Sequence, residues 1–138
     1  MKGDALILVV EDNEANQLLA RAVLELEGFT VEVAGSAVEA REALRDGAPA
    51  LILMDIQLPG EDGLSLTRAL KADPATAAIP VVALTAHAMT GDREVALEAG
   101  CAGYIAKPID TRTFGFEVRQ FLARAAARTG EDHTLVAS

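Results

Sequence analysis

The sequence has few aromatic, basic and sulfur-containing side chains, and each shortage excludes a class of protein. One cysteine, Cys101, allows no internal disulfide and no cysteine-rich metal site. The absence of tryptophan and the single tyrosine, Tyr104, argue against a surface that stacks nucleotide bases or sugars. Only 12 basic residues stand against 21 acidic ones, and the net charge of −9 repels nucleic acid and anionic lipid. No apolar run approaches the roughly 18 residues that span a bilayer.

The composition that remains is that of one folded domain. The chain has 138 residues, of which 51% are hydrophobic and 24% charged, so it can bury a core. Acidic residues follow the start closely, at Asp4 and Glu11, which argues against a signal peptide and predicts a cytoplasmic protein. We expect a folded domain over residues 1–128 and a flexible tail over 129–138, where the apolar pattern fades.

Five short apolar runs predict five strands, each followed by a turn and a helical pattern. The runs cover residues 6–10, 31–33, 51–54, 81–84 and 103–105. The first run is continuous, as in a strand buried on both faces, whereas Val31 and Val33 alternate with polar residues, as in an edge strand. This alternation predicts an α/β fold, a doubly wound parallel sheet with helices on both faces.

Helix boundaries are marked by capping residues. Asn13 and Ser36 precede two helical patterns as N-caps, and Gly28 and Gly47 follow them as stops. Within the first pattern the apolar residues at helical spacing are Leu18, Leu19, Ala22, Val23 and Leu26. Within the last they are Phe114, Val118, Phe121 and Leu122.

Chemically active side chains follow four of the predicted strands. Glu11 and Asp12 follow the first strand, Asp55 the third, Thr85 the fourth and Lys107 the fifth. Sites in open parallel sheets form at the carboxyl ends of the strands, so these side chains are expected to meet in one crevice.

The three carboxylates of this crevice predict a metal site. Two carboxylates about 4 Å apart repel by about 4 kcal/mol at an effective dielectric constant near 20, so the cluster favours a cation. Oxygen ligands without histidine or cysteine favour Mg²⁺, with Mn²⁺ as the alternative. Mg²⁺ keeps coordination positions for phosphate oxygens, and an aspartate can itself attack phosphorus. With the ammonium of Lys107 and the hydroxyl of Thr85, the set predicts a phosphoryl-accepting site.

Four segments of the sequence resemble the receiver domains of two-component response regulators, the CheY-like family. They are residues 8–13, 51–59, 80–86 and 103–108, and the resemblance spans roughly residues 5–124. It is strongest toward single-domain regulators of cell division and the receivers of hybrid kinases. The resemblance implies a flavodoxin-like (βα)5 fold with strand order 2-1-3-4-5.

The resemblance also implies roles for the site residues. Asp55 is implied as the phosphoacceptor and Asp12 as a direct metal ligand, with Glu11 acting directly or through water. The backbone carbonyl of Gln57 is implied as a further ligand, and Lys107 as the ion-pair partner of the phosphoryl group.

A second group of residues is implied in switching. Thr85 and Tyr104 resemble the family's switch pair, in which the threonine moves toward the phosphoryl group and the aromatic ring turns inward. The bond before Pro108 is implied to be cis, and His87 lies where family side chains tune the lifetime of the phosphoryl group.

The function expected from these residues is that of a stand-alone receiver in a phosphorelay. A histidine kinase or histidine phosphotransfer protein would phosphorylate Asp55 with Mg²⁺, and the protein would catalyse its own phosphorylation and dephosphorylation without being an enzyme for another substrate. Output is expected through protein–protein contacts rather than DNA, because no effector domain follows Arg128. We expect a monomer or weak homodimer, with the first helix as the kinase-docking surface.

Two other classes of protein share features of this predicted site or fold. Phosphatases of the haloacid dehalogenase type also use an aspartate, a lysine and Mg²⁺, but they carry a second acid where this chain has Gln57. A flavodoxin-like flavin site needs a phosphate-binding loop after the first strand, where Glu11 and Asp12 would repel the phosphate.

Overall fold

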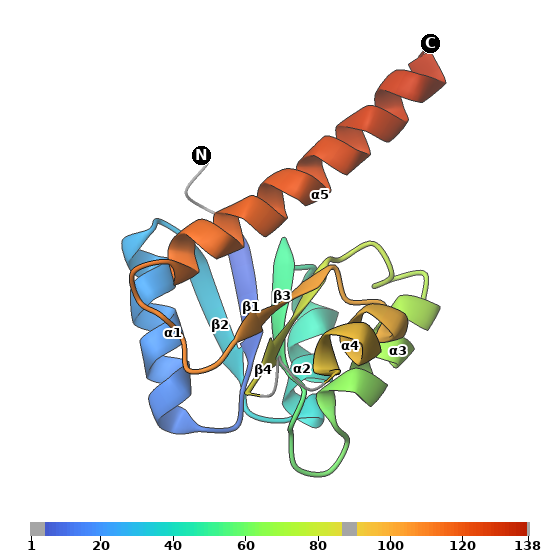
Figure 1. Cartoon of the computed structure of the whole chain (residues 1–138). Coiled ribbons are helices and arrows are strands. Elements are labelled where there is room, and N and C mark those ends of the chain that lie inside the picture. Colours follow the sequence, from blue (N-terminus) through green and yellow to red (C-terminus); the bar gives the residue numbers. More distant parts are fainter. Residues whose placement is uncertain (1–4, 87–90, 138) are drawn as a thin grey trace.

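A five-stranded parallel sheet forms the centre of the molecule (Figure 1). The computed structural model describes residues 5–86 and 91–137, with the backbone alone for residues 92 and 128–137. The strands are β1 (Leu6–Val10), β2 (Thr30–Ala34), β3 (Leu51–Asp55), β4 (Val81–Thr85) and β5 (Gly103–Ala106). They lie in the order β2-β1-β3-β4-β5, and every neighbouring pair is parallel. The predicted flavodoxin-like order is therefore confirmed.

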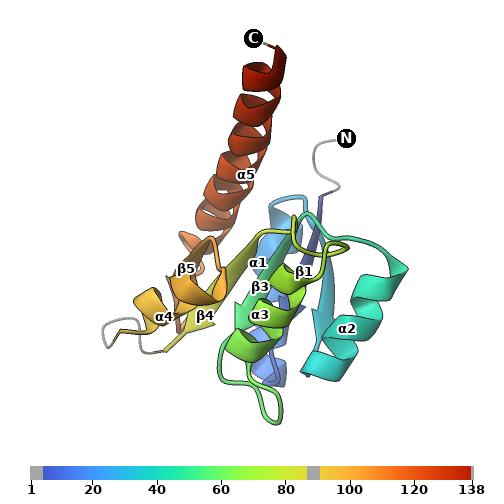
Figure 2. The ribbon, with the colours of Figure 1, turned by 90° about the vertical axis from the view of Figure 1, so that its right-hand side faces the viewer.

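Helices cover both faces of this sheet (Figure 2). They are α1 (Glu14–Leu26), α2 (Ala37–Asp46), α3 (Gly63–Ala72), α4 (Asp92–Ala99) and α5 (Phe114–Ala137). Helices α1 and α5 pack on one face, where Leu24 and Phe114 are fully buried. Helices α2, α3 and α4 pack on the other, which confirms the doubly wound arrangement.

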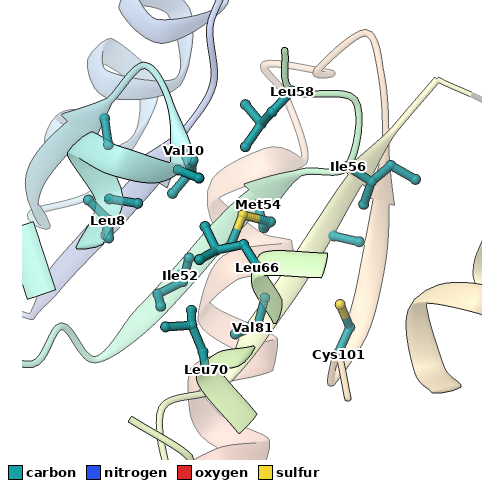
Figure 3. Packing of buried hydrophobic residues seen from close by; sticks show 14 of the residues in the cluster. Leu8, Val10, Ile52, Met54, Ile56, Leu58, Leu66, Leu70, Val81 and Cys101 are labelled. Atoms are coloured by element: carbon teal, nitrogen blue, oxygen red, sulfur yellow. The ribbon is translucent and has the colours of Figure 1, made fainter. Parts of the chain in front are cut away.

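The inner strands are buried on both faces, as their continuous apolar runs predict. On the face toward α2, α3 and α4, Ile52 and Met54 of β3 lie against Leu66 and Leu70 of α3 (Figure 3). Cys101 belongs to the same cluster and is buried, as expected for a small apolar residue near a turn. Because helices cover both faces of the sheet, polar side chains of the inner strands can meet a ligand only at the ends of the strands.

Helix α1 buries a different face from the one its leucines suggest. Ala20 and Leu24 are buried against the sheet, whereas Leu18 is 66% exposed and Leu26 is 88% exposed. Asn16 and Gln17 in its first turn are half-buried. The helix has apolar side chains on two sides, so hydrophobic spacing alone cannot show which side meets the sheet.

Helix α5 continues beyond the point where its apolar pattern fades. The sequence predicts an end near Arg128, but the helix runs to Ala137 and extends away from the sheet (Figures 1 and 2). The segment after Phe121 is rich in alanine and contains no proline, so local helix propensity carries the helix past its last core contacts. The flexibility of residues 129–138 stays a prediction. In the described part of the chain, no helix combines the length and the apolar character needed to cross a membrane.

Candidate functional site

The carboxyl ends of the central strands bring the predicted acidic residues together. Glu11 and Asp12 follow β1, and Asp55 is the last residue of β3. Each offers a carboxylate oxygen that lies within 4.8 Å of the others. Glu11 and Asp55 are both only 2% exposed, whereas Asp12 is exposed at the mouth of the site. The site therefore brings together two buried carboxylates and one exposed carboxylate.

Lys107, directly after β5, bridges the two buried carboxylates. Its Nζ donates to Oε1 of Glu11 at 3.1 Å and to Oδ2 of Asp55 at 3.2 Å. Three carboxylates and one ammonium leave a formal surplus of two negative charges. A divalent cation would balance that surplus, and the donors are all oxygen, the ligand type that Mg²⁺ prefers. The residues present therefore fit a hard divalent cation.

Hydrogen bonds from the backbone hold the acidic side chains in place. The N–H of Asn13 donates to Oε2 of Glu11 at 3.2 Å, and the N–H of Gln57 donates to Oδ1 of Asp55 at 2.9 Å. The side-chain amide of Gln17 on α1 donates to the carbonyl of Glu11 at 2.5 Å, which ties α1 to this turn. The carboxylates are thus positioned before any ligand arrives.

The pKa values of Glu11 and Lys107 are both raised, but by different causes. Burial, followed by the charge of Asp55, raises the pKa of Glu11 above its ordinary value of 4.5, although Asn13 and Lys107 oppose the shift. Burial alone lowers the pKa of Lys107, but the carboxylates of Asp55 and Glu11 outweigh it and raise that pKa above 10.5. The surroundings therefore disfavour the ionised form of Glu11, and Lys107 stays charged at neutral pH.

Glu11→Gln is expected to stabilise the metal-free protein at pH 7 by about 1 kcal/mol. Because the folded pKa of Glu11 is raised, the parent loses stability as pH rises from 4.5 through that pKa, and the neutral amide avoids this loss. Urea unfolding between pH 4 and pH 7 measures the effect, as a gap between variant and parent that widens with pH.

Asp62→Asn is the matched control, because Asp62 is exposed outside the acidic cluster and asparagine can also cap α3, so its replacement should change stability by less than about 0.5 kcal/mol. A Glu11→Gln variant that is less stable than the parent at pH 7 without metal would contradict this account of the site.

The switch candidates lie on β4 and β5, neighbouring strands of the sheet. Thr85 ends β4 and is 2% exposed, and its carbonyl accepts a backbone hydrogen bond from the N–H of Lys107 at 2.8 Å. Tyr104 on β5 is half-buried, and the bond between Lys107 and Pro108 is cis, as the resemblance implied. His87 lies outside the described residues.

Two features of the site have no signal in the pattern of strand ends. Gly63 packs so tightly that an added Cβ would lie 2.2 Å from the carbonyl oxygen of Asp55. Arg41 of α2 makes a two-pronged ion pair with Glu61, which anchors the loop between β3 and α3. The close approach of Gly63 constrains the backbone at Asp55, and the Arg41–Glu61 pair joins α2 to the following loop. Each contact joins residues that sequence spacing does not relate.

The comparisons with known proteins agree with this geometry. The sequence profile described as "response regulator receiver domain" matches residues 7–118. The chain belongs to the response regulator receiver family. The receiver is 43% identical over 119 residues to the polar-differentiation response regulator DivK of Brucella ovis, a match that covers 86% of this chain and 97% of DivK.

Solved receivers share the fold. A CheY-like receiver domain protein from Methanospirillum hungatei superposes with a TM-score of 0.81 at 26% identity, covering 91% of this receiver and 98% of that chain. The receiver domain of a sensor histidine kinase from Pseudomonas aeruginosa gives 0.76 at 37% identity, covering 88% and 96%. That structure holds a magnesium ion in its active-site cleft.

Proposed function

We propose that this receiver accepts a phosphoryl group on Asp55 from a phosphohistidine and then changes its contacts with other proteins. The observation that carries the proposal is the position of Asp55, which is buried between the ammonium of Lys107 and the acidic pair Glu11 and Asp12. A carboxylate in this position can act as a nucleophile while neighbouring charges balance the incoming phosphoryl oxygens.

Mg²⁺ is the proposed cofactor. Asp12, Asp55 and Glu11 would hold it, with the backbone carbonyl of Gln57 as a further ligand. When bound, the ion supplies charge neutralisation and a fixed orientation for the phosphoryl oxygens. The magnesium-bound receiver from Pseudomonas aeruginosa supports this choice, as does the all-oxygen donor set.

In the proposed reaction, a carboxylate oxygen of Asp55 attacks phosphorus. An O–P bond forms, the N–P bond of the phosphohistidine breaks, and the imidazole leaves and takes up a proton. The N–H of Gln57 holds the attacking carboxylate in orientation. Lys107 pairs with one phosphoryl oxygen, and the Thr85 hydroxyl donates a hydrogen bond to another.

Phosphorylation then acts on Thr85 and Tyr104. The phosphoryl group adds about 1.5 to 2 negative charges at a site that already holds a negative surplus. We propose that Thr85 moves toward the new group, Tyr104 turns inward behind it, and the surface of α4, β5 and α5 changes its binding partner. Thr85 is the last residue of β4, and Tyr104 lies in the neighbouring strand β5. A change at the phosphoryl group therefore needs to pass through few residues to reach this surface.

Lys107→Ala is expected to retain Mg²⁺ binding and to lose switching. The ammonium of Lys107 would draw the phosphoryl group toward β5, so without it the addition of a phosphodonor should leave Tyr104 fluorescence unchanged. Arg112→Ala, which removes an exposed cation from the following loop, should switch like the parent. A Lys107→Ala variant that changes its Tyr104 signal as the parent does would refute the role of the lysine.

The proposed surface for the phosphodonor protein is the exposed side of α1. Leu18, Leu19 and Leu26 are 66%, 37% and 88% exposed, so a helix close to the acidic cluster presents apolar side chains to solvent. Exposed apolar side chains gathered on one helix are typical of a surface that binds another protein.

Leu18→Glu is therefore expected to slow phosphotransfer from a cognate kinase or phosphotransfer protein about tenfold or more, by removing an apolar contact at the interface. Val38→Glu on α2 is the control, because Val38 is 65% exposed and lies away from this surface. Labelling by a small phosphodonor should be the same in both variants. Equal rates of transfer from the protein donor to both variants would exclude α1 as the docking surface.

The experiment that tests the function is labelling with acetyl phosphate or phosphoramidate in the presence of Mg²⁺. We expect labelling that approaches one phosphoryl group per chain and that requires the metal. Steady turnover of a small phosphoester would instead favour the phosphatase class. A cytoplasmic location and a monomeric or weakly dimeric state stay predictions.

A further inference from the structure

Tyr104 contacts a cation from the neighbouring helix. The guanidinium carbon of Arg93, in the first turn of α4, lies 5.9 Å from the centroid of the Tyr104 ring. A cation over the face of an aromatic ring within about 6 Å is attracted by the negative charge of that face. The contact joins α4 to β5, two of the elements that form the surface affected by the proposed switch.

The ring also borders open space. A hollow of about 320 Å³ lies between β5 and α5. Its lining consists of Tyr104, Phe116, Glu117, Gln120, Phe121 and Arg124. A ring that adjoins a hollow is not enclosed on all sides by packed side chains, so its orientation depends on the contacts it does make.

We propose that Arg93 is a positioning residue for Tyr104: its contact stabilises the resting orientation of the ring and opposes the inward orientation. This inference rests on the proposed function, because it assumes that Tyr104 takes part in the switch. A conformational equilibrium shifts when a contact made in only one of its states is removed. A cation–ring contact at an exposed position is worth about a two- to fivefold change in such an equilibrium.

The described residues contain other pairs of this kind, and they supply a control. Arg124 lies 5.3 Å from the ring of Phe121, and Arg119 lies 5.2 Å from the ring of Phe29. Arg124 lines the same hollow as Tyr104 but stacks on a different ring. Arg124→Gln therefore removes a matched cation from the same surface without touching the proposed contact.

The composition of the chain provides a direct readout. Tyr104 is the only tyrosine and there is no tryptophan, so tyrosine fluorescence reports on this ring alone. The test compares the parent with Arg93→Gln, Arg93→Lys and Arg124→Gln. For each protein, acrylamide quenching of Tyr104 is measured without phosphodonor and with beryllofluoride and Mg²⁺, and the initial rate of labelling by phosphoramidate is recorded. Circular dichroism shows that each variant is folded.

Without phosphodonor, Arg93→Gln is expected to show Tyr104 quenching shifted toward that of the beryllofluoride-bound parent. Its initial labelling rate should be about two- to fivefold higher, because the conformer that accepts the phosphoryl group is more populated. Arg93→Lys, which keeps the cation, and Arg124→Gln should resemble the parent.

Arg93→Gln with the quenching and labelling rate of the parent would overturn the inference, and so would an equal shift in Arg124→Gln. A parent that is not labelled at all would overturn the proposed function itself. The two failures are therefore distinguished by the parent alone.

Discussion

Asp55→Asn is expected to abolish labelling by acetyl phosphate or phosphoramidate in the presence of Mg²⁺. The amide has nearly the shape of the carboxylate but is not a competent nucleophile toward phosphorus. It also removes one of the three negative charges that meet at the site, so Mg²⁺ binding should weaken. Intact-mass spectrometry after incubation with the donor measures the effect, which should be complete loss rather than partial reduction.

Asp62→Asn is the control for this experiment. Asp62 is exposed and caps α3 by accepting from the N–H of Ser65 at 2.8 Å, a bond that asparagine can also accept. This variant should be labelled like the parent. Equal labelling of Asp55→Asn and the parent would place the phosphoryl group elsewhere.

Gly63→Ala is expected to destabilise the protein by about 3 kcal/mol or more and to impair labelling. The new Cβ would lie 2.2 Å from the carbonyl oxygen of Asp55 and 2.8 Å from the Cα of Ile56. Both neighbours are backbone atoms at or directly after the end of β3, so they cannot move aside without displacing Asp55, the proposed phosphoacceptor. Urea unfolding gives the loss of stability, and labelling of the folded fraction gives the loss of function.

Gly60→Ala separates this close approach from the ordinary cost of replacing a glycine. Gly60 lies in the same loop with a φ of +76°, and nothing lies within 4 Å of an added Cβ. Its replacement should cost only about 1 kcal/mol, from backbone strain. If both variants lost the same stability, steric contact with Asp55 would not be the cause of the Gly63 effect.

The sheet could be predicted because a strand that is buried on both faces has a continuous run of apolar residues. Apolar residues occupy every position of β1 and nearly every position of β3, and turn residues separate these runs from the helical patterns. Because the strands are parallel, Asp55 and Lys107 both lie at the carboxyl ends of the strands. In the structure, Nζ of Lys107 lies 3.2 Å from Oδ2 of Asp55. The candidate site therefore follows from strand order and the identity of the residue after each strand.

The orientation of α1 and the length of α5 could not be predicted in the same way. Helix α1 has apolar side chains on two sides, and packing against the sheet selects Leu24 over Leu26. Helix α5 continues to Ala137 through local propensity, after the contacts that produce an amphipathic pattern have ended. In both helices the apolar pattern indicates only which residues can be buried. It does not determine which side of α1 faces the sheet or where α5 ends.

The contacts of Gly63 and Arg93 could not be predicted from the sequence either. Each depends on the close approach of residues from different elements, Gly63 against Asp55 and Arg93 against Tyr104. Neither leaves a periodic signal, because a single contact does not repeat along the chain. Such contacts become visible only when the elements are assembled.

A structure of the protein with beryllofluoride and Mg²⁺ tests the central claim most directly. We expect the beryllium group on the carboxylate of Asp55, the metal among Glu11, Asp12 and Asp55, and both Thr85 and Tyr104 displaced from their present positions. A site that stays empty at saturating concentrations, with Thr85 and Tyr104 unmoved, would contradict the account.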